Sequence, residues 1–341
     1  MANHGAVAGG EQMLLRMAAA ARDEGLEVLV AGPPTPVGLS GSAAELGLRF
    51  LPTRGGSQAA RYLNTRRTLR RLDNELIWCN GPFPGLSALG SGVPWTLHLH
   101  QEPSRLQAPL VRLMRNGAVS TVVPSHSMEH ALPGSAVMWN WTSEPQGREK
   151  PREDGTFRIG FLGRLSPIKG VTVLAGAVEA LRDEAPGRVR LLLGGDARFV
   201  PRALRREVRR SLERIADVCE PLGWTDPRAV FARASVVAVP SIWDEPFGLV
   251  AAEAMAERIP LVVSDAGALP EVVGQGHPWV ARRGSTEDLA RILCRVRDEP
   301  SAREQSVAAA RRRWEKLFSP PAGRRRFLQV LQDMFERSEV A

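Results

Sequence analysis

Residues 234–274 read ASVVAVPSIWDEPFGLVAAEAMAERIPLVVSDAGALPEVVG, and they carry the clearest structural pattern in the chain. The short β-branched run at residues 235–239 is typical of a strand that is buried on both faces of a parallel sheet. Pro240 ends this run, a loop follows at residues 241–247, and Gly248 opens a helix of small residues. The order of strand, loop, helix and strand predicts a doubly wound α/β domain.

Two acidic residues in this stretch suggest chemistry. Glu245 lies in the loop, and Glu253 lies in the second turn of the expected helix. The free N–H groups at the start of a helix attract an anion, and carboxylates accept hydrogen bonds from sugar or ribose hydroxyls. An anion held beside a polyol describes a nucleotide sugar. The alternative is an ordinary loop acid and a solvated helix acid without a shared ligand.

The joint pattern PS-x3-E-PFG-x4-E-A-x-A resembles the E-x7-E signature of the retaining GT-B glycosyltransferases of the family 4 type. The resemblance implies two Rossmann-like, doubly wound domains that face a cleft. It also implies that Glu245 contacts the donor sugar and that Glu253 holds the ribose hydroxyls. Backbone N–H groups at Phe247, Gly248 and Leu249 would then contact the sugar or the diphosphate.

A second motif follows an expected strand at residues 157–162. Gly163, Arg164, Lys169 and Gly170 form GR-x4-KG. An Arg fork and a Lys point charge at a strand-to-helix turn are common means of holding phosphate oxygens. In the resembled family, these two cations neutralise the leaving diphosphate. The alternative is a solvated loop with two incidental cations.

The N-terminal segment AVAGGEQMLLRMAAAARDEG, residues 6–25, favours a helix that begins near Gly9 and Gly10. Two interpretations stay open: a glycine loop that feeds the helix and can hold a phosphate, or a plain helix start. In the resembled family such glycines line the donor pyrophosphate, and a central first strand precedes them. Only eight residues precede Gly9 here. We therefore expect the first strand to be missing or reduced to a stub, with a start site upstream of Met1 as one explanation. Further strands are expected at residues 27–31, 48–51, 76–79, 95–100 and 119–123, and helices at 57–72 and 104–116.

His98 and His100 alternate with Leu97 and Leu99, so both imidazoles lie on one face of the expected strand. Three interpretations stay open: a hydrogen-bonded core pair, a metal site completed by Glu102, or a residue at the reaction centre. The third follows from the resemblance, in which a histidine after this strand lies near the sugar, and His100 fits that place better than His98.

The polar segment at residues 142–156 predicts a linker. We expect an N-terminal acceptor-side domain at residues 1–141, a nucleotide-sugar-binding domain at 157–318, and a C-terminal helix at 319–341 that crosses back to the first domain. The resemblance also places the backbone of Gly223 beside the nucleotide base.

The net charge of +8 comes almost entirely from Arg, because Lys150, Lys169 and Lys316 are the only lysines. No basic stripe interleaved with aromatic residues is present, so nucleic acid is not an expected partner. A peripheral contact with anionic membrane stays open, for which the basic amphipathic helix at residues 201–215 is one candidate. No apolar run reaches the roughly 20 residues of a membrane span, and no signal peptide is visible. The odd, scattered Cys79, Cys219 and Cys294 indicate reduced thiols and a cytoplasmic location.

The predicted function is sugar transfer from a nucleoside-diphosphate sugar to an acceptor hydroxyl, with retention at the anomeric carbon. The candidate catalytic residues are His100, Arg164, Lys169 and Glu245, and neither a metal nor another cofactor is expected. The alternatives are an inactive nucleotide-sugar-binding protein and a nucleotide-sugar epimerase of related shape. The acceptor, the sugar and the base are not predicted, although residues 33–41, 80–85 and 101–107 are candidate acceptor loops.

Overall fold

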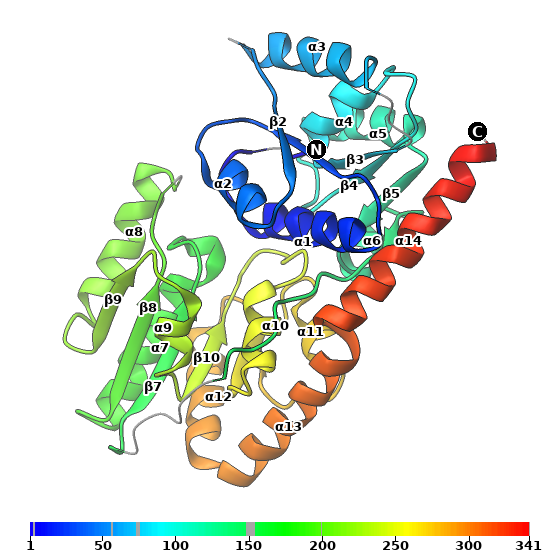
Figure 1. Cartoon of the computed structure of the whole chain (residues 1–341). Helices are drawn as coiled ribbons and strands as arrows, with labels where there is room; N and C mark the ends of the chain where they lie inside the picture. The colour runs from blue at the N-terminus through cyan, green and yellow to red at the C-terminus, as the bar shows by residue number, and fades with distance from the viewer. Residues whose placement is uncertain (3, 56, 73–75, 148–153, 199, 341) are drawn as a thin grey trace. The chain divides into compact units, whose positions relative to one another are not determined.

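The computed structural model describes residues 1–340 except 3, 56, 73–75, 148–153 and 199. The chain forms two compact units, the first made of Met1–Asn140 with Pro321–Ala341 and the second of Trp141–Pro320. Both units are built from parallel strands and covering helices (Figure 1). The α/β class predicted from the sequence is therefore confirmed.

The sheet of the second unit has the strand order β9-β8-β7-β10-β11-β12, and every pair is parallel. The order reverses between β7 and β10, which are adjacent in the sheet but far apart in the chain. Ligands of doubly wound sheets bind at this reversal, outside the carboxyl ends of the strands. The elements of this unit are β7 (Phe157–Leu162), the 3-10 turn η1 (Pro167–Lys169), α7 (Val171–Glu184), β8 (Val189–Gly194), α8 (Arg202–Glu213), β9 (Cys219–Gly223), α9 (Pro227–Phe231), β10 (Val236–Val239), α10 (Leu249–Ala256), β11 (Leu261–Ser264), α11 (Leu269–Val273), β12 (Val280–Ala281), α12 (Thr286–Asp298) and α13 (Pro300–Leu317).

The core of the second unit explains why its strands lack polar alternation. All four residues of β10 and all four of β11 are buried, because helices cover both faces of the sheet. On one face, a Cβ at Gly160 or Gly194 would lie 2.7 Å or 3.0 Å from Val230 of α9. The short helix α9 thus packs closely because two strand positions have no side chain.

The first unit contains two groups of parallel strands, β1-β2 and β3-β4-β5-β6. Its core includes Leu97, Met114 and Val123. The elements of this unit are α1 (Gly9–Asp23), β1 (Leu29–Gly32), α2 (Gly38–Glu45), β2 (Arg49–Pro52), α3 (Gln58–Leu69), β3 (Ile77–Asn80), α4 (Pro82–Ala88), β4 (Trp95–His98), α5 (Ala108–Gly117), β5 (Ser120–Val123), α6 (His126–Ala131), β6 (Ala136–Val137) and α14 (Pro320–Val340).

Met1 and Ala2 lie between β1 and β3. Ala2 forms a parallel bridge with Asn80, and its N–H donates to the Ala31 carbonyl at 2.7 Å. The Met1 carbonyl accepts from the Asn80 N–H at 2.9 Å. Two residues therefore join β1 on one side to β3 on the other.

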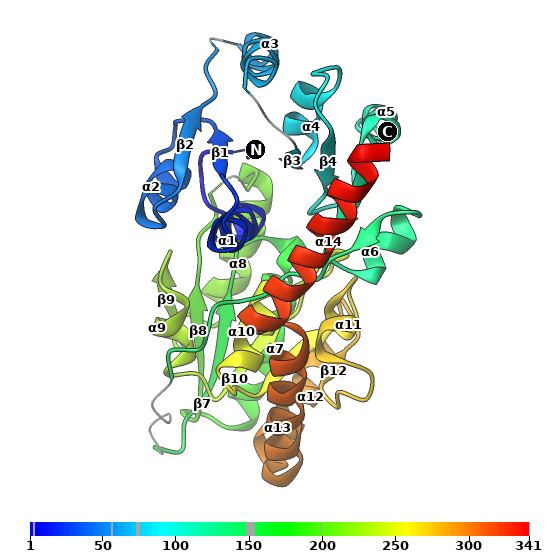
Figure 2. The ribbon, with the colours of Figure 1, turned by 45° about the vertical axis from the view of Figure 1, so that its right-hand side comes forward.

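Helix α14 packs against the strands of the first unit, as Figure 2 shows beside β4. The Phe327 ring meets the Trp78 ring edge to face at 5.5 Å. The Arg326 guanidinium lies 5.1 Å from the Trp139 ring centroid and donates to the Trp139 carbonyl at 3.0 Å. Burial lowers the pKa of Arg326 to about 10.

Several predicted boundaries were wrong, each for a local reason. The strand expected at residues 95–100 ends at His98, and the helix expected from residue 104 begins at Ala108. Segments 33–41 and 80–85, expected as loops, contain the beginnings of α2 and α4. Pro82 is compatible with a first helical turn, where no backbone N–H is needed, so a Pro- and Gly-rich segment did not exclude a helix.

The segments that follow β7 and β10 pack closely against each other at Gly170. Its φ is +75°, and a Cβ there would lie 1.8 Å from the Pro240 carbonyl oxygen. Gly187 has nearly the same φ, +78°, but open space around it. We predict that G187A costs only the left-handed strain of about 1–2 kcal/mol, whereas the clash in G170A adds about 1–3 kcal/mol. Equal losses in urea unfolding would contradict this packing.

Candidate functional site

The carboxyl ends of β7 and β10 bring Lys169 and Glu245 together. Lys169 ends the 3-10 turn after β7, and its Nζ forms an ion pair with Glu245 Oε1. The two segments are joined through their backbones, because the Ile242 N–H donates to the Ile168 carbonyl at 2.9 Å. Residues 76 positions apart in sequence thus form one polar group at the reversal of strand order.

Glu245 is held as a buried carboxylate, with only 6% of the residue exposed. The Ser241 hydroxyl donates to Oε1 at 2.6 Å, in addition to the Lys169 ammonium. The Ser264 hydroxyl in turn donates to the Ser241 carbonyl at 2.6 Å. A buried charge is tolerated when it is paired and hydrogen-bonded, and these contacts supply both conditions.

The backbone of this loop is fixed by glycine. Gly267 has a φ of +56°, and a Cβ there would lie 2.4 Å from the Glu245 nitrogen. The adjacent Ala268 N–H donates to the Glu245 carbonyl at 2.8 Å. No other residue type allows so close an approach of the two chain segments.

Gly248, Phe247 and Leu249 lie where α10 begins. Gly248 is the N-cap in the left-handed conformation, with a φ of +97°, and Leu249 is the first helical residue. The Phe247 side chain is buried and meets the Phe318 ring edge to face at 5.4 Å, so its backbone is the part available to a ligand. The first N–H groups of a helix have no partner within it, which makes this terminus suited to an anion. Glu253 lies half-buried in the second turn.

A row of glycines continues along the same edge of the sheet. Gly163, Gly195 and Gly223 lie at the ends of β7, β8 and β9, with φ values of +146°, +132° and +65°. Their backbones are linked, because the Gly195 N–H donates to the Gly223 carbonyl at 2.7 Å. The side chain of the neighbouring Arg164 is exposed, and it forms no ion pair with any residue that the structure describes. This edge therefore offers bare backbone and one uncommitted cation.

Gly9, Gly10 and His100 gather in the first unit. The glycines are the first two residues of α1, so the plain helix start is the interpretation that the structure bears out. A Cβ at Gly10 would lie 3.0 Å from His100 Cδ2, so the helix start and the imidazole are in direct contact. The Ala8 N–H donates to the buried Glu11 carboxyl at 3.4 Å, and burial raises the pKa of Glu11.

The two histidines differ in their contacts. His98 is fully buried, and neither ring nitrogen has a hydrogen-bond partner among the described residues. It packs between the Trp78 ring at 5.5 Å and the His100 ring at 4.0 Å. Burial lowers the pKa of both imidazoles, that of His100 to about 4. His98 is therefore a neutral ring in the core, without the hydrogen bonds that the core-pair interpretation expects.

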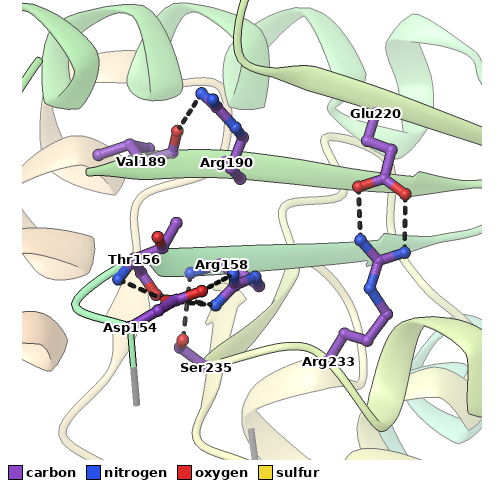
Figure 3. Close-up of polar contacts among 8 residues, drawn as sticks. All are labelled: Asp154, Thr156, Arg158, Val189, Arg190, Glu220, Arg233 and Ser235. Carbon is purple, nitrogen blue, oxygen red and sulfur yellow. Dashed lines mark hydrogen bonds and ion pairs between the residues drawn. The ribbon is translucent and has the colours of Figure 1, made fainter. Parts of the chain in front are cut away.

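A charged cluster in the second unit lies elsewhere (Figure 3). Arg233 donates to both carboxylate oxygens of Glu220, at 2.7 and 2.5 Å, and Arg158 donates to Asp154 at 3.0 Å. Arg158 and Glu220 are each the second residue of their strands, near the amino ends. In each pair the arginine is bonded to its own carboxylate partner, and neither pair belongs to the site around Lys169.

Sequence reasoning missed several residues. The sequence motif includes Ser241 without a separate role, and it assigns none to Ser264. Asn80 is the first residue of the candidate acceptor loop 80–85, but its side chain is buried. The contacts of Ser264 and Asn80 join distant segments, for which the chain carries no local signal. Within the described ranges, no group of three or more His, Cys, Asp or Glu side chains is arranged to hold a metal ion. None of the described helices combines the length and apolar character needed to cross a membrane.

Comparison with known proteins points to one family. The family model for glycosyl transferases group 1 matches residues 156–299, the part that carries Lys169 and Glu245. The chain is 34% identical over 205 residues to a D-inositol 3-phosphate glycosyltransferase of Corynebacterium glutamicum, covering 57% of this chain and 47% of that one. It is 33% identical over 180 residues to a glycogen synthase of Mycobacterium tuberculosis, covering 51% and 42%. The chain spans about half the length of the curated relatives it matches.

The fold is shared over nearly the whole chain. The structure of Anabaena HepE in complex with UDP-glucose superimposes with a TM-score of 0.84, at 21% identity, covering 97% of this chain and 98% of that one. At this identity the likeness concerns the fold, which is GT-B.

Proposed function

We propose that the chain transfers a sugar from a nucleoside-diphosphate sugar to an acceptor hydroxyl. The match of residues 156–299 to the model for group 1 glycosyl transferases supports this proposal. The single observation that carries the proposal is the buried Glu245 carboxylate paired with Lys169 at the reversal of strand order. The similar chain of Corynebacterium glutamicum is named a glycosyltransferase, which supports sugar transfer as the reaction class. HepE, which shares the fold, was solved in complex with UDP-glucose.

Each group at this edge has a role in the proposal. The diphosphate lies at the free N–H groups of α10 and near Arg164 and Lys169, which stabilise the negative charge that develops on departure. Glu245 accepts hydrogen bonds from the sugar hydroxyls, and Glu253 from the ribose. Gly163 and Gly223 present backbone to the diphosphate and the base, because no side chain blocks them.

We propose that the transfer retains the anomeric configuration. Retaining glycosidases place two carboxylates about 5 Å apart. At this edge, the neighbouring Asp244 is exposed and paired with Arg283 at 2.6 Å, so Glu245 is not faced by it. A front-side displacement fits this arrangement, with the leaving diphosphate helping to deprotonate the acceptor. Arg164 and Lys169 supply the positive charge, so the proposal needs no metal ion.

The first unit supplies the acceptor contacts in this proposal, through residues 33–41, 80–85 and 101–107. His100 lies at the reaction centre, next to the start of α1. Release of sugar from a bound donor distinguishes this enzyme from an inactive binding protein, which would bind the donor without breaking it. An epimerase would instead return a nucleotide sugar of altered configuration.

A cytoplasmic location with contact to anionic membrane is the proposed setting, and the described free thiols fit a reducing compartment. Helix α5 supports the contact better than the basic helix α8. Leu106, just before α5, is 94% exposed, and Leu110 and Leu113 of α5 are 39% and 55% exposed, while Val111 of the same helix is buried. Residues 103–128 contain three arginines and no acid. Apolar side chains beside arginines match the surface of an anionic bilayer.

Substitution by alanine tests whether activity depends on the buried Glu245 rather than on the exposed Asp244 beside it. We predict that E245A lowers sugar release or transfer by at least about 10²-fold, the usual cost of removing one preorganised polar group from a reaction centre. D244A is the matched control, since Asp244 is exposed and adjacent, and it should stay within about twofold of the wild type. Turnover of E245A at the wild-type rate would refute the site, provided that both variants melt as the wild type does.

Membrane contact is tested by sedimentation with vesicles. The wild type should bind vesicles that contain phosphatidylglycerol and not vesicles of phosphatidylcholine alone, and raised salt should weaken binding. The double variant L106D/L113D should lose binding, while L204D on α8 should keep it. Loss of binding in L204D alone would assign the contact to α8 and contradict this prediction.

A further inference from the structure

Asn80 connects the two functional segments of the first unit. It is the last residue of β3 and is 2% exposed. Its side-chain Nδ2 donates to the Gly10 carbonyl at 3.1 Å, and its Oδ1 lies 2.6 Å from His100 Nε2. One amide therefore touches both the first turn of α1 and the imidazole.

The surroundings determine which way the amide lies. If the amide were turned over, its oxygen would face the Gly10 carbonyl, and two acceptors would meet without a proton between them. The observed orientation is thus the one that satisfies Gly10. The backbone of Asn80 is fixed as well, because its N–H donates to the Met1 carbonyl at 2.9 Å.

This orientation decides the tautomer of His100. With the amide oxygen toward Nε2, that nitrogen has to carry the proton, and the lone pair of a neutral ring then lies on Nδ1. His100 Nδ1 is a buried atom without a hydrogen-bond partner among the described residues. A buried acceptor without a partner is costly, so this atom is suited to a hydrogen bond from a ligand.

We propose that Asn80 is a positioning residue that holds His100 as the Nε2–H tautomer and ties it to the start of α1 through Gly10. The role in catalysis rests on the proposed function, in which His100 lies at the reaction centre next to the start of α1. The hydrogen bonds of Asn80 to the Gly10 carbonyl and to His100 Nε2 then fix the imidazole relative to the first turn of α1. Burial, which lowers the pKa of His100, keeps the ring neutral for this purpose.

The tautomer is measured directly by ¹H–¹⁵N correlation spectra of the full chain with labelled histidine, assigned with an H100Q variant. We expect neutral His100 with a protonated Nε2 between pH 6 and 8. N80A should release the tautomer and lower kcat for sugar release by at least about tenfold, as loss of an outer hydrogen-bond partner does for other positioned histidines, with little change in donor KM. N64A is the matched control, because exposed Asn64 also donates to a backbone carbonyl, that of Arg54.

N80D keeps the shape of the side chain and gives a second readout if N80A folds poorly. A carboxylate beside the ring favours the imidazolium, so the pH at which His100 takes up its second proton should rise in N80D. A purely structural Asn80 would lower the melting temperature without moving tautomer or proton uptake. A wild-type Nδ1–H tautomer, or an N80A variant with unchanged tautomer and kcat, would overturn the proposal.

The two proposals fail in different ways. If the wild type releases no sugar from any nucleotide sugar, the proposed function fails, while the spectra still decide whether Asn80 holds His100. If the wild type releases sugar and the tautomer does not depend on Asn80, the positioning role fails alone.

Discussion

The ion pair of Lys169 and Glu245 is the contact on which the site depends. Neither residue follows the other closely in sequence, and they meet because β7 and β10 are neighbours at the point where the strand order reverses. A carboxylate in the interior is stable only while its partners stay in place, so the pair keeps a charged, ligand-accepting oxygen at a fixed position. In the proposed function, the Lys169 ammonium gains a second anionic partner when a diphosphate binds. The pair would then serve both halves of the proposed nucleotide-sugar site.

Backbone conformations available to glycine bring that pair within reach. Gly170 approaches Pro240, and Gly267 approaches Glu245, so closely that a Cβ at either position would collide with main-chain atoms. Gly163, Gly195 and Gly223 keep the adjacent strand ends free of side chains. The glycines allow the two charged segments to approach and leave backbone without side chains beside them. In the proposed function, the charged residues recognise the ligand against this backbone.

Much of the fold and the centre of the second unit's site were predictable from the sequence. A buried strand followed by an acidic loop and a small-residue helix predicts a carboxylate at the carboxyl edge of a parallel sheet, and GR-x4-KG predicts cations at the same edge. Parallel topology then brings Glu245 and Lys169 together. The contacts from Ser264 to Ser241 and from Asn80 to Gly10 were not predictable, because each joins segments brought together only by tertiary packing. Segments rich in Pro and Gly were expected as loops, yet α2 and α4 begin in them. In α4, Pro82 lies in the first helical turn, where it removes no hydrogen bond.

In the proposed function, the second unit binds a nucleoside-diphosphate sugar at the Lys169–Glu245 pair. The most direct measurement is the melting temperature of the purified chain with UDP-, GDP-, ADP- and dTDP-sugars, for the wild type and for K169M. Binding to the native state alone raises the free energy of unfolding with the logarithm of the ligand excess over Kd. One donor should therefore raise the melting temperature of the wild type and leave that of K169M almost unchanged. A wild type that responds to none of them, or a K169M variant that is stabilised equally, would contradict the claim.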